Sequence, residues 1–342
     1  MPAFEKAKWI WNGEMHSPNV YVSFEDSFSL PEKSGEVRLR ISCDRNYALY
    51  CNGKFVDCGQ YGDYEDLKYY DELDVTPYLS AGENKLLVTV FYQGQDCSNY
   101  RRGEAGVIYE VSGERGVLCA SSEQTVTYKN SAYEDGCGVE FVSGQLGFTF
   151  HYDSLRESER LFESRAELVF KTADIAPRPI KKLTISERVP AMLKNRGAFA
   201  DTVSSGTPAY KMQYSALDFS DPNTDMPLPS DAGIIIERSP SARASSGSFT
   251  PDGTFAVIDL GEENTGLLSL DIEVECDCDV FIGWGEHLDD MRVRSYVGGR
   301  NFAASYHAHA GRNVFFCPFL RCGLRYLQLA VYAPSFVLHY AG

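Results

Sequence analysis

The chain has 342 residues, and its 48 acidic against 32 basic side chains give it a formal net charge of −16 at pH 7. Hydrophobic residues make up 44% of it, which is enough apolar material for packed cores and excludes wholesale disorder. The excess of acid opposes binding to nucleic acid or to an anionic membrane, because both depend on Lys and Arg side chains that neutralise phosphates. Sugars and neutral small molecules remain as candidate ligands.

No apolar run reaches the roughly 18 residues that a membrane helix needs, and residues 1–8 are not followed by the apolar core of an export signal. We therefore expect a cytoplasmic protein without membrane contact. The ten cysteines fit this expectation, since a chain of this size without an export signal keeps its thiols reduced. The closest pairs, Cys276 with Cys278 and Cys317 with Cys322, have no histidine at zinc-finger spacing, which favours buried thiols over a zinc site.

In the first half of the chain, apolar and polar residues alternate with a period of two. Residues 22–30 have this pattern and predict a strand with one buried face. Residues 47–56 predict a hairpin, because Asn52 and Gly53 at its centre supply the two positive φ angles of a type I′ turn. Residues 85–92 are apolar on both faces and predict a central strand. Further strands are expected at residues 37–41, 106–111, 116–120, 125–128 and 145–152.

A second block of strands begins near residue 165, and a Ser-, Pro-, Asp- and Gly-rich stretch interrupts it at residues 201–253. A strand-like island at residues 233–238 favours an ordered insertion here over a linker. Strands are expected at residues 166–172, 268–274, 280–284 and 327–331, with a short helix near residues 189–196.

This pattern predicts an all-β chain of two antiparallel β-sandwich domains. We place a jelly-roll, galactose-binding-like domain at residues 1–158. A second β-sandwich follows at residues 159–342 and contains the insertion at about 201–253.

Several short segments resemble the β-sandwich domains of bacterial α-L-rhamnosidases of glycoside hydrolase family 78. In the first domain these are Ala-Lys-Trp-Ile-Trp at residues 7–11, Tyr-Cys-Asn-Gly-Lys at 50–54, and the run from Tyr70 to Leu79 followed by Ala-Gly-Glu-Asn at 81–84. In the second domain they are Ile-Asp-Leu-Gly-Glu-Glu-Asn-Thr-Gly at 258–266, Gly-Glu-His-Leu-Asp-Asp at 285–290 and Gly-Leu-Arg-Tyr-Leu-Gln-Leu at 323–329. Their order and spacing span almost the whole chain.

The resemblance implies a role without catalysis for these residues. In that family the chemistry lies in a helical (α/α)6 barrel that follows the sandwiches, where one carboxylic acid protonates the leaving oxygen and a second carboxylate activates water. No carboxylate pair in this chain matches those positions, and Gly342 lies about where the barrel would begin, so we expect no catalytic residue. The chain is then the amino-terminal region of such an enzyme, with the barrel and a rhamnose-containing glycan as partners. The alternative is a free-standing sandwich protein that binds carbohydrate or protein without hydrolysing it.

Two loops of the first domain carry residues suited to binding a sugar, because aromatic faces stack on the apolar face of a pyranose and its hydroxyls need polar partners. The first loop contains Tyr61, Asp63 and Tyr64, and the second contains Arg101 and Arg102. The alternative for the first loop is that its tyrosines pack over the edge of the sandwich.

Acidic pairs in the second domain raise the question of a structural calcium ion. Asp289 with Asp290 and Asp277 with Asp279 offer the oxygen ligands that Ca²⁺ prefers, but EF-hand spacing is absent. We expect these to be solvated turn carboxylates, with no metal ligand and no cofactor in the chain.

Overall fold

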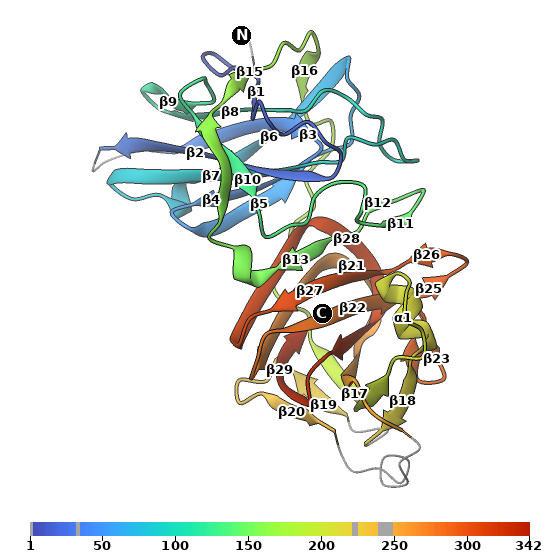
Figure 1. Cartoon of the computed structure of the whole chain (residues 1–342). Helices are drawn as coiled ribbons and strands as arrows, with labels where there is room; N and C mark the ends of the chain where they lie inside the picture. The colour runs from blue at the N-terminus through green and yellow to red at the C-terminus, as the bar shows by residue number, and fades with distance from the viewer. Residues whose placement is uncertain (1–2, 32–34, 221–224, 239–248) are drawn as a thin grey trace. The chain divides into compact units, whose positions relative to one another are not determined.

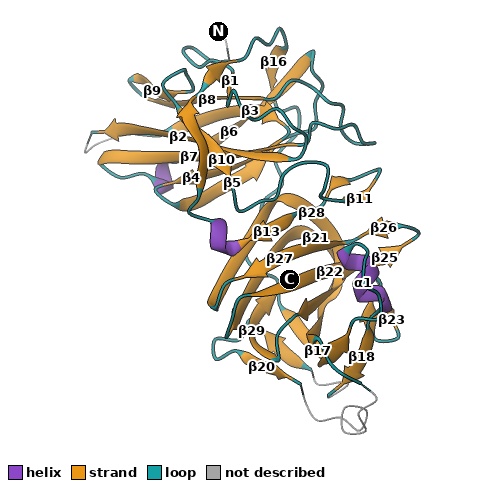
Figure 2. Cartoon of the chain, in the orientation of Figure 1, coloured by secondary structure: helices purple, strands orange, loops and turns teal. Residues whose placement is uncertain are grey.

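The computed structural model describes residues 3–31, 35–220, 225–238 and 249–342. It is 57% strand and 4% helix, and its strands form mainly antiparallel sheets (Figure 2). The prediction of an all-β fold is therefore confirmed. Two strand pairs in the large sheets are parallel. One joins β13 (His151–Asp153) to β27 (Ala303–Ala308), and the other joins β16 (Asp174–Pro177) to β6 (Leu67–Asp74).

The chain divides into two compact units that interleave along the sequence. The first unit contains Met1–Gly138, Gly144–Gly147 and Ser158–Thr184, and the second contains Val139–Ser143, Phe148–Glu157 and Ile185–Gly342. The segment after residue 158, which the sequence assigns to the second domain, supplies strands to the first unit instead. Each unit is therefore built from separate stretches of sequence.

The first unit has two sheets. In the six-stranded sheet the order is β14-β10-β2-β7-β4-β5, and in the seven-stranded sheet it is β15-β1-β8-β3-β6-β16, with β9 beside β8. Besides β6 and β16, the strands are β1 (Ile10–Trp11), β2 (Val20–Leu30), β3 (Arg38–Asp44), β4 (Asn46–Cys51), β5 (Lys54–Gly59), β7 (Gly82–Tyr92), β8 (Gly106–Gly113), β9 (Gly116–Ala120), β10 (Val126–Asn130), β14 (Arg160–Arg165) and β15 (Glu167–Leu168). A short 3-10 helix, η1, spans Thr76–Tyr78.

The core of the first unit follows from the alternation in its strands. In β2, Val20, Val22 and Phe24 are completely buried, and the ring of Trp11 packs 5.5 Å from that of Phe24. The predicted hairpin joins β4 to β5, where Asn52 has a φ of 51° and Gly53 a φ of 76°. These left-handed angles are the ones that an Asn-Gly turn accommodates without strain.

The second unit is organised around one ten-stranded sheet in the order β13-β27-β22-β28-β21-β17-β18, with β19 beside β17 and β29 between β21 and β20. Its remaining strands are β17 (Ala191–Ala200), β18 (Ala216–Phe219), β19 (Met226–Leu228), β20 (Ile234–Glu237), β21 (Gly253–Val274), β22 (Cys278–Gly285), β28 (Gly311–Val331) and β29 (Ser335–Ala341). Short pairs are β11 (Phe141–Ser143) with β12 (Gly147–Phe148), β23 (Leu288–Asp289) with β24 (Arg292–Val293), and β25 (Tyr296–Val297) with β26 (Arg300–Asn301), and a second 3-10 helix, η2, spans Ser154–Arg156.

Two long strands, β21 and β28, hold this sheet together (Figure 1). They pair on both sides of a bulge between Asp259 and Asn264, where Gly261 has a φ of 82°. Up to Asp259, β21 also pairs with β17, and from Leu270 onward it pairs with β29. A bulge bends the strand that carries it, and on the two sides of this one β21 has different neighbours.

The prediction of a helix near residues 189–196 is wrong. Residues 191–196 of that segment belong to β17, in which Ala191, Leu193 and Asn195 are buried on alternate positions. Leu193 and Asn195 pair with β21, and Ala191 pairs with β19. Its Met, Leu and Lys residues are good helix formers, but burial between neighbouring strands overrides that propensity.

The described parts of the predicted insertion are ordered elements of the second unit. The helix α1 spans Pro208–Tyr214, where the Thr207 side chain accepts the N–H of Tyr210 and Pro208 occupies the first turn. β18 and β19 pair with β17, and β20 pairs with β29. Residues 221–224 and 239–248 of the expected insertion lie outside the described residues.

Arg292 donates hydrogen bonds to the carboxyl-terminal end of α1. Its Nη1 lies 3.2, 2.7 and 2.9 Å from the carbonyl oxygens of Met212, Gln213 and Ser215. These belong to the last helical turn and the residue after it, where carbonyls have no partner within the helix. A positive charge also suits the negative end of the helix dipole.

We expect Arg292→Met to lower the free energy of unfolding by about 2–3 kcal/mol, because it removes a charged hydrogen-bond donor and leaves these carbonyls without it. Urea denaturation of the full chain measures the change. The matched variant Arg300→Met, at an exposed residue of β26, should stay within about 0.5 kcal/mol of the parent. Equal stability of the two variants would contradict this role of Arg292.

Candidate functional site

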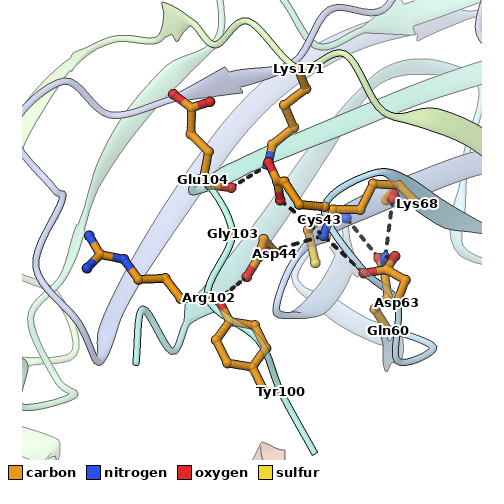
Figure 3. Close-up of polar contacts among 12 residues, drawn as sticks. Cys43, Asp44, Gln60, Asp63, Lys68, Tyr100, Arg102, Gly103, Glu104 and Lys171 are labelled. Carbon is orange, nitrogen blue, oxygen red and sulfur yellow. Dashed lines mark hydrogen bonds and ion pairs between the residues drawn. The ribbon is translucent and has the colours of Figure 1, made fainter. Parts of the chain in front are cut away.

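Two loops of the first unit meet beside the end of β3, around the ammonium group of Lys68 (Figure 3). Lys68 lies in β6 with only 2% of its side chain exposed. Its Nζ donates to Oδ1 of Asp63 at 3.0 Å and to Oδ2 of Asp44 at 3.2 Å, and Oε2 of Glu65 lies 3.9 Å away. Three carboxylates from separate positions in the chain thus surround one buried cation.

The two nearest carboxylates have further donors. Asp63 Oδ2 accepts the side-chain amide of Gln60 at 2.6 Å and the N–H of Tyr69 at 3.0 Å. Asp44 Oδ1 accepts the hydroxyl of Tyr100 at 2.6 Å. A buried ion pair is tolerated when its other lone pairs are hydrogen-bonded in this way.

The charges in this network shift one another's pKa values. Burial alone would lower the pKa of Lys68, but the carboxylates of Asp44 and Asp63 outweigh it and raise that pKa. Burial raises the pKa of Asp63, and the opposing effect of Lys68 and the N–H of Tyr69 only partly compensates. Burial, followed by the Asp44 charge, also raises the pKa of the Tyr100 hydroxyl. Lys68 is therefore a fixed positive charge at neutral pH.

A second lysine extends the network to the segment after β15. The side chain of Lys171 is completely buried, and its Nζ lies 3.0 Å from Oε1 of Glu65. It also donates to the carbonyl oxygen of Glu104 and lies 5.2 Å from the ring centroid of Trp9. Glu65 thus stands between two buried ammonium groups.

Gly103 allows this close approach. A Cβ atom at position 103 would lie 2.0 Å from Oε2 of Glu65 and 2.8 Å from Oδ2 of Asp44. Any larger residue would displace one of these carboxylates. Residues 60–66 and 93–105 therefore meet at this glycine.

The structure separates the five residues predicted to bind a sugar into two groups. Asp63 is 7% exposed, and its carboxylate forms an ion pair with Lys68. The ring of Tyr61 packs edge-on against Tyr69, with the guanidinium of Arg178 5.3 Å from its centroid. Packing at the edge of the sandwich, the alternative interpretation of this loop, thus describes Tyr61. Asp63 and Tyr61 shape the loop.

Tyr64, Arg101 and Arg102 remain at the surface. The side chain of Tyr64 is 66% exposed. Arg101 is 67% exposed, with Nη1 3.6 Å from Oδ2 of Asp96. The backbone N–H of Arg102 donates to Asp96 Oδ1 at 2.7 Å, and its side chain points away from the cluster in Figure 3. Sugar binding by these residues stays a prediction.

Sequence reasoning missed Lys68, Asp44 and Lys171. A weak signal exists for Lys68, because it lies at an inward position of β6 beside a loop rich in Asp and Glu. Nothing local marks Lys171 or Asp44, since their partners are distant in the sequence.

Two of the four acidic residues considered as calcium ligands, Asp277 and Asp279, have other partners. Oδ1 of Asp279 lies 2.6 Å from Nδ1 of His307, and Oδ1 of Asp277 accepts the N–H of Ala310. Asp289 and Asp290 follow one another where β23 turns toward β24. Within the described ranges, no three His, Cys, Asp or Glu side chains are grouped as metal ligands would be.

None of the ten cysteines, all of which are among the described residues, forms a disulfide bond. None of the described helices has the length and apolar character to cross a membrane. The cytoplasmic location stays a prediction.

Replacing Lys68 with Met should lower the free energy of unfolding by about 3–5 kcal/mol, because it leaves Asp44 and Asp63 buried without their cation. Adding Asp63→Asn removes one of the unpaired charges and should recover part of that loss. Chemical denaturation checks both, with Lys85→Met at an exposed position of β7 as the control. A Lys68→Met chain as stable as this control would show that the network does not stabilise the fold.

No family model and no curated protein matches this sequence. Solved structures match it in fold. The GH78 family rhamnosidase of Bacillus sp. GL1 aligns with a TM-score of 0.72 and 17% identity over 98% of this chain and 54% of that chain. The α-L-rhamnosidases of Dictyoglumus thermophilum and Aspergillus terreus each align with a TM-score of 0.58 and 16% identity. These alignments cover 97% and 98% of this chain but 35% and 36% of the enzymes.

The chain thus spans about a third to a half of the length of these enzymes. The resemblance to glycoside hydrolase family 78, predicted from the sequence, is confirmed by the structure: this chain has the fold of a β-sandwich portion of the α-L-rhamnosidases.

Proposed function

We propose that this chain is the non-catalytic β-sandwich region of an α-L-rhamnosidase-like glycoside hydrolase, where it supports the catalytic barrel, and that its first unit binds rhamnosyl glycans. The observation that carries the proposal is the likeness in fold, which extends over 98% of this chain but only 54% of the Bacillus enzyme. The likeness includes both units, so it is not a match of one common sandwich.

The carboxylates of the described residues support a role without catalysis. An inverting glycosidase needs an acid with a raised pKa and a base about 6.5–9.5 Å from it across a sugar cleft. Burial raises the pKa of Asp26 and of Asp63, but both are held by internal donors. Asp26 accepts the hydroxyls of Tyr109 at 2.6 Å and Thr125 at 2.8 Å. Neither carboxyl is placed to protonate a leaving group.

The purified chain should therefore not hydrolyse an aryl α-L-rhamnoside, because the two carboxyl groups whose pKa burial raises, Asp26 and Asp63, are both held by internal donors. Release of the aryl alcohol, followed by absorbance, measures this. Turnover that persists after repurification and is abolished by Asp63→Asn or Asp26→Asn would overturn the proposal of a non-catalytic region.

The exposed residues of the two loops support the binding of a glycan. Tyr64 offers an aromatic face to the apolar face of a pyranose, and Arg101 and Arg102 offer donors to its hydroxyls. The buried network beneath them fixes the loops, so little conformational freedom is lost on binding. A mono- or disaccharide gains only one or two stacked faces, so we expect a dissociation constant in roughly the micromolar to millimolar range.

Replacing Tyr64 with Ala should weaken binding of L-rhamnose or a rhamnosyl oligosaccharide about tenfold, a loss of about 1.4 kcal/mol, because it removes the stacking face. Calorimetric titration measures the change. Phe170→Ala removes a more exposed aromatic ring, 85% exposed, from the same unit outside the two loops, and should leave binding unchanged. Saturable binding that survives both Tyr64→Ala and Arg101→Ala would exclude these loops as the site.

A further inference from the structure

One face of the second unit's sheet brings together polar and aromatic side chains. In β22 and β27, Asp279 is opposite His307 and Phe281 is opposite Ser305. Opposite residues share a face of a sheet, as do residues two apart along a strand. These four side chains therefore lie on the same face.

Tyr332, which directly follows β28, extends this face. Its N–H donates to the carbonyl oxygen of Asp279 at 2.9 Å, and its ring lies 5.2 Å from that of Phe281 in an edge-to-face arrangement. Both rings are partly buried against the hydrophobic cluster that contains Phe255 and Ala330. They form an aromatic floor that remains partly open to solvent.

The helix α1 covers only one end of this face. Met212 packs against Gly283, and Nζ of Lys211 lies 5.7 Å from the ring centroid of Phe281. No hydrogen bond or ion pair joins this ammonium group to a described residue, although the chain carries 48 acidic side chains. Lys211 is thus a half-buried cation that rests on an aromatic ring with its donors unused.

The polar groups at the open end complete the arrangement. The side chain of Asp279 is 65% exposed, and that of His307 is 36% exposed. Nδ1 of His307 lies 2.6 Å from Oδ1 of Asp279. The other ring nitrogen, Nε2, can also donate or accept a hydrogen bond. We call the set Lys211, Asp279, Phe281, Ser305, His307 and Tyr332 the β22 shelf.

We infer that the β22 shelf binds a neutral saccharide. Phe281 and Tyr332 supply apolar surface for a pyranose ring. Lys211 supplies donors and Asp279 supplies acceptors for its hydroxyls, which need both. The shelf lies in the second unit, so it is separate from the loops that contain Tyr64 and Arg101.

The charges of the shelf select against an anionic ligand. The hydroxyl of Tyr332 donates to Asp201 at 3.0 Å, and Oδ2 of Asp252 accepts the N–H of Asp201 at 2.8 Å. With Asp279, three carboxylates act on the hydroxyl of Tyr332, while the shelf holds one ammonium group, that of Lys211. A phosphate or a uronate would meet net repulsion, while a neutral ring with hydroxyls would not.

This inference deepens the proposed function by naming a second place for the same class of ligand, and it rests on that proposal only for the choice of L-rhamnose as the probe. Alanine methyl groups in the full chain separate the two sites in an NMR titration. Ala330 is opposite Phe281 in the sheet, and Ala105 follows the loop that contains Arg101 and Arg102. Both methyl groups are buried, so each reports on its own unit.

L-Rhamnose should shift the Ala330 methyl resonance saturably, and glucuronate at the same concentration should not. Asp279→Ala should raise the dissociation constant from the Ala330 shift about tenfold and Lys211→Ala about threefold, while neither changes the Ala105 shift. Glu275→Ala and Lys181→Ala, at exposed positions that are not part of the shelf, are the matched controls and should change nothing. If Asp279→Ala disturbs the fold, Lys211→Ala still provides the test, because Lys211 has no polar partner among the described residues to lose.

Each outcome separates the two proposals. A shift of Ala105 alone would overturn the β22 shelf and leave the proposed loop site standing. A shift of Ala330 that depends on Asp279 and Lys211, without one at Ala105, would support the shelf and exclude the loops. An Ala330 shift that both shelf variants leave unchanged, or that glucuronate reproduces, would overturn the inference.

Discussion

The first unit depends on the buried ammonium group of Lys68 and the carboxylates around it. Lys68 is held by Asp44 and Asp63, and Glu65 connects it to Lys171. Because these five residues come from β3, the loop before β6, β6 itself and the segment after β15, their mutual attraction fixes where four parts of the chain lie. An apolar cluster of the same size would hold these parts with less directional precision, because ion pairs and hydrogen bonds require specific distances.

Ion pairs also hold residues 171–182 in place. This segment belongs to the first unit, although residues 148–157 before it belong to the second. Lys171 is bound to Glu65, Arg178 donates to both carboxylate oxygens of Asp71, and Lys182 donates to Asp57. In the second unit, Asp259 is paired with Arg325 and Asp271 with Arg312, and in each case the arginine helps to lower the pKa of the aspartate against the effect of burial. A chain with a net charge of −16 thus uses several of its cations in ion pairs with its own carboxylates.

Local patterns in the sequence predict the strands of this protein well, and they predict less about what joins the strands. The alternation in β2 and the Asn52-Gly53 turn each depend on neighbours within a few residues, so they can be recognised in the sequence. The helix expected at residues 189–196 fails because pairing of β17 with β21, about 60 residues later, decides its conformation. For the candidate site, the sequence points to Tyr64, Arg101 and Arg102, which are exposed in the structure and whose binding of a sugar stays a prediction. The sequence does not show that Asp63 is buried in an ion pair with Lys68, because burial of a polar residue depends on tertiary packing.

The interleaving of the two units has a consequence for the order in which the chain can fold during synthesis. The first unit needs strands up to β16, so it can be completed only after residue 177 has left the ribosome, although most of its core lies within the first 130 residues. β13 must wait longer, because its partner β27 begins at residue 303. During that interval the edge of β13 has no strand to pair with, although every segment of the first unit has already been synthesised. Contacts that close so late are slow to form and leave intermediates prone to association, so the middle of this chain, rather than either end, is where folding in the cell needs protection.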